Sequence, residues 1–314
     1  MHSTTNAYAS EPAVPLLAHS LLQHDVATAE DPPNTESAPT NPSLSNPDWN
    51  LEHDIRNGVE YPPMGIFGPG TVIGFSFMRN DSKEGDDLDH IGQIPRYLLA
   101  ARLRQSAQCP NTNPSAFIIY PAHFDAFSPE KLLESLLSAS QSPTLSRSDA
   151  ISRLDSVQLI PVFDFSAASQ ALHQIEDSLS LQQPDQNVTL IIAGLDSLTE
   201  GVIRASNAVR GAAVLTSVMR TLTQLSRTHS MHLSIVLVNT GGLGQLAPSY
   251  NPRPSTDDSQ HHPAADDAKT LDHGIDTHLL LSVVRGQACV VEVIKDRVGD
   301  GVGKWRTNLL FNES

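Results

Sequence analysis

The sequence predicts an α/β fold in which a mostly parallel sheet is covered by helices on both faces. Short apolar segments alternate with segments of helical periodicity along residues 71–294. One apolar segment, 188–193, is followed closely by a single acid, Asp196, and then by a hydroxyl, Ser197. Such alternation is typical of parallel sheets, whose ligands bind at the carboxyl ends of the strands.

Residues 1–60 are predicted to form a disordered tail. Residues 31–50 hold five prolines among Asn, Ser and Thr, and such a segment buries too little apolar surface to offset its ordering entropy. Residues 61–314 are long enough for one large core domain. Within it, residues 241–272 are rich in glycine, proline and polar residues, so we expect a flexible loop insertion there.

The charge, the lengths of the apolar runs and the cysteine content argue against several classes of function. The formal net charge is −15 and the chain has five lysines, which opposes the clustered positive charge of a general nucleic-acid-binding surface. A protein partner fits this charge better. No run of about twenty apolar residues predicts a membrane span, and no N-terminal pattern predicts a signal peptide. Cys109 and Cys289 match no metal-type spacing, which suits a reducing compartment.

The strands are predicted from short runs rich in β-branched, aliphatic and aromatic residues. They lie at 71–77, 116–120, 157–163, 188–193, 233–238, 278–284 and 288–294. The last two are expected to be antiparallel.

The helices are predicted from apolar periodicity and capping residues. Ser128 and Pro129 mark one helix start, as N-cap and first-turn residues. Ser166 is predicted to cap another helix that runs through Leu179. Two further helices are predicted at 93–106 and, as one long segment, at 202–229.

Polar residues follow two of the central strands. Asp196 and Ser197 follow one of them, and Asn239 and Thr240 follow the next. Asp196 could hold magnesium or could cap the turn into 199–204. In the same way, Asn239 and Thr240 could sense a γ-phosphate or could satisfy a turn.

Six segments occur in an order that matches a known pattern. They are Phe117–Tyr120 with Phe127–Leu132, Val162–Phe165 with Ser166–Leu172, Leu190–Leu198, Leu222–Asn239, His278–Leu281 and Lys295–Arg297. Over about residues 65–311 they resemble the ATPase core of the RecA-type recombinases, particularly the eukaryotic recombination-repair paralogues. The resemblance implies a RecA-like P-loop NTPase core. It gives Asp196, Ser197 and Asn239 cofactor-binding positions, with Asp196 as the Walker B magnesium ligand.

The sequence departs from this family at the phosphate loop. The family pattern G-x-x-x-x-G-K-[ST] follows a strand and opens a helix. Here the one glycine pair with that spacing is Gly65 and Gly70, with Thr71 in the lysine position, and a predicted strand follows it. The segment in the expected place, 78–92, is acidic and would repel a triphosphate. Either ATP binding was lost, or residues 65–95 differ from those of the true transcript.

Basic residues are concentrated in two places. Arg204 and Arg210 could contact DNA phosphates. The resemblance implies that Lys295 and Arg297 could contact the nucleotide of a neighbouring subunit, since the equivalent C-terminal strands approach it in RecA-like filaments. In both places, a solvated surface with incidental charge is the competing interpretation. The loop 241–272 takes the position of the family's second DNA-binding loop.

His229 and His232 are three residues apart at the predicted end of the long helix. No third ligand is evident in the sequence, so the spacing alone predicts no metal site there.

The combined expectation is a nuclear RecA-like paralogue in homologous-recombination DNA repair. It would be a structural subunit without ATPase activity that binds other RecA-fold recombinase or paralogue subunits. Within such a complex it could contact DNA, and we expect no contact with a membrane. We expect no cofactor, with ATP and magnesium as the alternative. Two other functions stay open: an active DNA-dependent ATPase of the same family, and a RecA-like accessory subunit of Elongator in tRNA modification. A cytoplasmic location is the alternative to the nuclear one.

Overall fold

The computed structural model of the protein describes residues 51, 53–55, 67–78, 87–105, 115–138, 145–181, 187–240, 274–284, 288–297, 299 and 301–308. The chain divides into two compact units, Met1–Ser45 and Asn46–Ser314, and every described residue belongs to the second. Most of the predicted tail and the whole of the predicted loop insertion, 241–272, lie outside the described residues.

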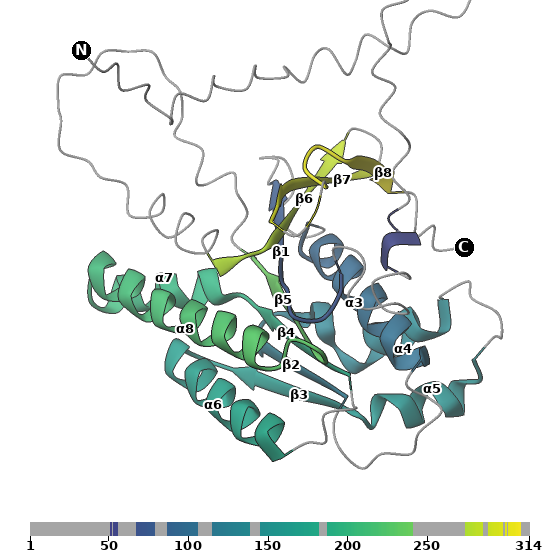
Figure 1. Ribbon diagram of the computed structural model, residues 1–314, viewed down its shortest axis with the longest axis horizontal. Helices are drawn as coiled ribbons and strands as arrows, with labels where there is room; N and C mark the ends of the chain where they lie inside the picture. Colours follow the sequence, from purple (N-terminus) through teal and green to yellow (C-terminus); the bar gives the residue numbers. More distant parts are fainter. Residues whose placement is uncertain are drawn as a thin grey trace, which may run out of the picture. The chain divides into compact units, whose positions relative to one another are not determined.

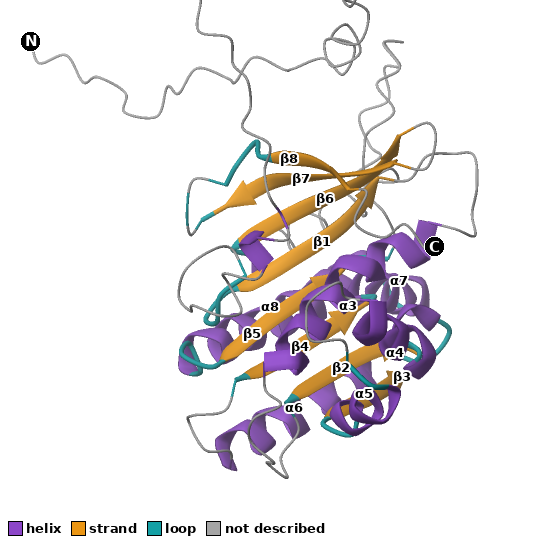
Figure 2. Ribbon diagram, turned by 90° about the vertical axis from the view of Figure 1, so that its right-hand side faces the viewer, coloured by secondary structure: helices purple, strands orange, loops and turns teal. Residues whose placement is uncertain are grey.

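The described part of the second unit is built on one eight-stranded sheet. Figure 2 shows the strands of this sheet side by side. Its strand order is β3-β2-β4-β5-β1-β6-β7-β8. All neighbours from β3 to β6 pair in parallel, and the pairs β6–β7 and β7–β8 are antiparallel. The strands are β1 Val72–Met78, β2 Ala116–Pro121, β3 Val157–Val162, β4 Val188–Ala193, β5 Leu233–Val238, β6 Thr277–Val284, β7 Ala288–Asp296 and β8 Trp305–Asn308.

Helices cover both faces of the parallel part of the sheet (Figure 1). On one face, a core cluster joins α3, α4 and α5 to side chains such as Ile118, Ile191 and Val236. On the other face, α6, α7 and α8 pack on Leu190 and Ile235. The helices are α3 Asp87–Gln105, α4 Pro129–Ser138, α5 Arg147–Leu154, α6 Phe165–Leu181, α7 Leu195–Ala205 and α8 Ala208–Thr228.

The α/β class, the mostly parallel sheet and its antiparallel end are therefore confirmed. The central strands β4 and β5 have the predicted bounds and are buried along their whole length, as parallel strands covered on both faces should be. Leu51 and Ile55, which lie within the predicted tail, are also buried in the first core cluster.

Several predicted helix bounds were wrong. The first helix begins at Asp87 and not at 93. Ser166 lies inside α6, and Asp164 caps that helix, since its carboxylate accepts the N–H of Ala167 at 2.8 Å. Helix α5 and strand β8 were not predicted at all.

The predicted long helix 202–229 is two helices, α7 and α8. Ser206 ends α7 with non-helical backbone angles, and the side chain of Asn207 caps α8 by accepting the N–H of Arg210 at 2.9 Å. A Cβ on Gly211 would collide with Ile203, so this glycine allows α7 and α8 to pack closely. The break lies at the Ser-Asn pair, which favours a helix start over a helix interior.

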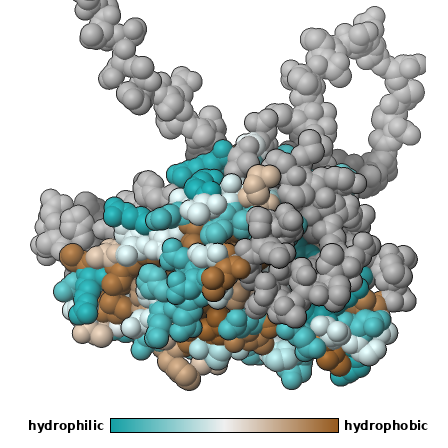
Figure 3. Space-filling model, turned by 60° about the horizontal axis from the view of Figure 1, so that its bottom comes forward, coloured by the Kyte–Doolittle hydropathy of each residue, from teal (hydrophilic) through white to brown (hydrophobic). Residues whose placement is uncertain are grey.

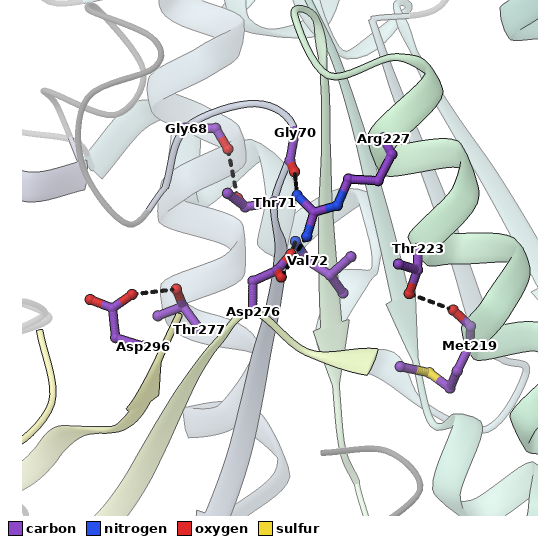
Figure 4. Close-up of polar contacts among 10 residues, drawn as sticks. All are labelled: Gly68, Gly70, Thr71, Val72, Met219, Thr223, Arg227, Asp276, Thr277 and Asp296. Atoms are coloured by element: carbon purple, nitrogen blue, oxygen red, sulfur yellow. Dashed lines mark hydrogen bonds and ion pairs between the residues drawn. The ribbon is translucent and has the colours of Figure 1, made fainter. Parts of the chain in front are cut away.

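The amino edge of the sheet is held by an ion pair (Figure 4). Arg227, at the end of α8, contacts the carboxylate of Asp276 at 2.8 Å and donates to the carbonyl of Gly70 at 2.9 Å. The same carboxylate accepts the N–H of Val72 at 3.0 Å, and the Asp276 side chain is 6% exposed. These contacts tie α8 to the starts of β1 and β6.

A second arginine is inserted at the same edge. Arg102, near the end of α3, donates to the hydroxyl of Ser234 at 2.6 Å, to the carbonyl of Phe67 at 2.8 Å and to the hydroxyl of Thr189 at 3.3 Å. All three described partners are neutral. Burial lowers the pKa of the Arg102 guanidinium to about 10.

Candidate functional site

Asp196 lies at the carboxyl edge, in the first turn of α7. Strand β4 ends at Ala193, and Gly194 turns the chain with a φ of 70°. A Cβ on Gly194 would also collide with Pro121, so both backbone angle and space require glycine. Asp196 does not cap a turn that leads into 199–204, because it lies with these residues inside α7. An acid in a first helical turn is stabilised by the partial positive charge of the helix N-terminus.

The carboxylate of Asp196 is held by the end of the neighbouring strand. Its Oδ1 accepts the backbone N–H of Thr240 at 3.1 Å and the Thr240 hydroxyl at 3.3 Å. The hydroxyl of Ser197 donates to the carbonyl of Gly194 at 2.9 Å and so closes its own turn. The structure thus brings together the polar residues that follow β4 and those that follow β5, and it links them through the contact between Asp196 and Thr240.

Asn239 takes part in a buried relay across three strands. Its Nδ2 donates to the hydroxyl oxygen of Ser76 at 2.8 Å, and that oxygen lies 2.8 Å from Nε2 of His278. Ser76, His278 and Asn239 are 0%, 5% and 9% exposed. Because an amide N–H2 can only donate, Ser76 accepts from Asn239 and its own proton is available to His278.

Sequence reasoning missed Ser76 and His278. Ser76 is the one polar residue of β1, and His278 precedes an apolar run in β6, and these positions were the available signal. A polar side chain at such a position needs a buried partner, and the neighbouring strands supply it.

Gly70 and Thr71, the described part of the glycine pair pattern, lie at the wrong end of β1 for a phosphate loop. Gly70 and Thr71 precede β1, and the hydroxyl of Thr71 donates to the carbonyl of Gly68 at 2.7 Å. A phosphate loop must instead follow its strand and open a helix. The residues that do so, between β1 and α3, are 79–86, and they lie outside the described residues.

The four basic candidates do not form one patch. Arg204 pairs with Glu200 on its own helix, and Arg210 is exposed at the start of α8. Arg210 and Arg227 are separated by about 25 Å of helix, from a rise of about 1.5 Å per residue. Arg227 contacts Asp276, whose carbonyl accepts the N–H of Arg297 at 2.9 Å. Lys295 and Arg297 therefore lie by the amino edge, far from Arg204 and Arg210.

Two histidines meet in the turn between α8 and β5. Nδ1 of His229 lies 3.2 Å from Nε2 of His232, and the two ring centroids are 5.1 Å apart. The pKa of His232 is lowered, mainly by burial and to a smaller extent by the neighbouring His229.

Among the described residues, no group of three or more His, Cys, Asp or Glu side chains is placed to hold a metal ion, and Asp196 belongs to none. No described helix is long and apolar enough to span a membrane. In comparisons with known proteins, no family model and no curated protein matches this chain.

Proposed function

We propose that this chain is a RecA-like paralogue in homologous-recombination DNA repair that acts as a structural, partner-binding subunit without ATPase activity. The mostly parallel α/β sheet is compatible with a P-loop-like core. The family assignment rests on the ordered sequence segments, from Phe117–Tyr120 to Lys295–Arg297. The expected location is the nucleus.

The contact between Asp196 and Thr240 carries the non-catalytic part of the proposal. A magnesium ligand must present carboxylate oxygen to the ion. Here Oδ1 of Asp196 already accepts two hydrogen bonds from the end of β5. The acid therefore has a structural role, which is to fasten α7 to β5 at the edge where a nucleotide would bind.

The sequence before α3 supports the same conclusion. The loop that should cradle phosphates is rich in Asp and Glu, and no Gly-Lys-Ser/Thr triplet occurs in it. Phosphate loops bind through backbone N–H groups and a lysine, so added carboxylates oppose binding. A chain that keeps the Walker B-like acid and lacks the lysine fits a fold that has been retained after nucleotide binding was lost.

The free edge of β3 is the surface that we assign to a partner. This strand pairs with β2 on one side and, among the described strands, ends the sheet on the other. Beside it, α4 and α5 enclose a cavity of about 380 Å³, lined largely by apolar residues. Its apolar lining consists of Pro129, Leu132, Leu133, Ile151, Leu154, Val157 and Leu159.

An extended partner segment can add a strand to such an edge and place an apolar side chain in the adjoining cavity. Figure 3 shows hydrophobic side chains interspersed with hydrophilic ones over this side of the molecule. We propose that the segment bound at the β3 edge comes from another RecA-fold subunit. Contact with DNA is assigned to the assembled complex, through Arg204 and Arg210.

Affinity purification from cells with damaged DNA tests the proposal. We expect RecA-fold recombination subunits to co-purify, and Ile151→Glu to remove them. Ile151 is 47% exposed and lines the cavity, so this change should spare the fold. Val209→Glu, at a residue that is 80% exposed on α8, is the matched control and should retain the partners. Recovery of tRNA-modification subunits in place of repair subunits would reject the repair function.

A further inference from the structure

The turn between α8 and β5 is fixed by backbone hydrogen bonds. His229 ends α8 and its N–H reaches the carbonyl of Leu225 at 2.9 Å. The carbonyl of His229 accepts the N–H of His232 at 3.1 Å and that of Leu233 at 2.8 Å. The carbonyl of His232 accepts the N–H of Val188 at 2.7 Å. Both histidine backbones are therefore positioned by α8, β4 and β5 together.

This fixed turn brings the two imidazoles together and leaves them partly exposed. Their facing nitrogens, Nδ1 of His229 and Nε2 of His232, are 3.2 Å apart, with the rings inclined at 72°. Arg227, two residues before His229, directs its guanidinium to Gly70 and Asp276. Its positive charge is thus compensated at the amino edge.

The separation of the two nitrogens matches metal chelation. Zn–N bonds of about 2.0–2.1 Å at a tetrahedral angle place two nitrogens about 3.3–3.4 Å apart. An ion could therefore take the place of the hydrogen bond between the two rings at nearly the same nitrogen–nitrogen separation. Each imidazole would bind the ion in its neutral form, so the proton between the facing nitrogens would move, by exchange with solvent, to the other nitrogen of the ring that carries it.

We propose that His229 and His232 form a two-imidazole site for a divalent transition-metal ion of the zinc class, with water completing the coordination shell. Two protein ligands leave open positions, in contrast to a closed structural zinc site with four. The bound ion would cross-link the end of α8 to the residue before β5. The site lies at the amino edge, so it is independent of Asp196 and of any nucleotide.

Calorimetric titration of the untagged full chain with zinc chloride at neutral pH tests this site. We expect His229→Asn and His232→Gln each to weaken one zinc-binding event at least about tenfold, since changes to residues that only orient metal ligands already cost about 10–100-fold. Thermal unfolding gives a second readout. Zinc should raise the Tm of the wild-type chain, and neither variant should show that rise.

Two controls separate the pair from other zinc-binding groups. Met231→Leu changes an exposed residue between the histidines, and His173→Gln removes an exposed histidine on α6. Both should retain wild-type zinc affinity. The site is overturned if the His229 and His232 variants, folded by circular dichroism, keep both the wild-type affinity and the zinc-induced rise in Tm. If one variant fails to fold, the other decides.

Discussion

The two edges of the sheet use their charged residues in different ways. At the amino edge, the carboxylate of Asp276 is almost fully buried and is paired with an arginine and a backbone N–H. At the carboxyl edge, Asp196 is half-buried and is held by Thr240, a neutral residue. The comparison shows that an ion pair between two side chains holds the amino edge, whereas at the carboxyl edge, where α/β proteins bind nucleotides, a backbone N–H and a hydroxyl hold the carboxylate.

The largest effect is expected at Asp276. Asp276→Ala removes the ion pair and leaves the N–H of Val72 buried without its acceptor. We expect a loss of about 3 kcal/mol in the free energy of unfolding, at the low end for a broken buried pair because the Arg227 side chain is 56% exposed. Urea unfolding measures this. Asp276→Asn retains one acceptor and should lose less, and equal losses would contradict the assigned pairing.

The loss of stability expected on replacing Arg102 is smaller, and further substitutions should restore most of it. Arg102→Met removes three donated hydrogen bonds and leaves their acceptors buried, which should cost about 2 kcal/mol. Replacing its side-chain partners as well, with Thr189→Val and Ser234→Ala, should recover much of the loss. Apolar groups of similar shape then fill the site without desolvated charge. No recovery in chemical denaturation would show that the hydrogen bonds themselves, and not their orphaned partners, set the stability.

At the carboxyl end of β5, the buried relay should contribute about 1–2 kcal/mol. Ser76→Ala leaves the amide of Asn239 without an acceptor and His278 without the hydroxyl. Ser226→Ala is the matched control. Its hydroxyl is buried on α8 and has no hydrogen-bond partner among the described groups, so its loss should be neutral or slightly stabilising. Similar thermal-unfolding shifts for the two variants would contradict the relay.

The smallest effect is expected at Asp196. Asp196→Asn keeps an oxygen that can accept both hydrogen bonds from Thr240, so it should cost less than about 1 kcal/mol. Thr240→Val removes the hydroxyl bond and retains the backbone bond, and it should cost a similar amount. A loss near that of Asp276→Ala, measured in the same urea series, would remove the contrast between the two edges.

Much of the fold was predictable because local composition determines it. The buried strands β4 and β5 are apolar except for Thr189 and Ser234, and their bounds follow directly from the sequence. The break between α7 and α8 was less visible, since apolar spacing continues across Ser206 and Asn207. The capping contact of Asn207 decides that break.

The candidate site was only partly predictable. Asp196, Asn239 and Thr240 follow their strands in the sequence, so their place at one edge could be inferred. Their partners could not, because Ser76 and His278 come from distant segments that only the strand order brings together. The facing of His229 and His232 likewise depends on the turn geometry and not on their spacing alone.

Binding of labelled ATP, with and without magnesium, tests the central claim that Asp196 closes the carboxyl edge and serves no nucleotide. The account predicts no saturable magnesium-dependent binding to the wild-type chain, and no difference from Asp196→Asn. Saturable binding that requires magnesium and is lost in Asp196→Asn would contradict it, and would make this acid a working ligand.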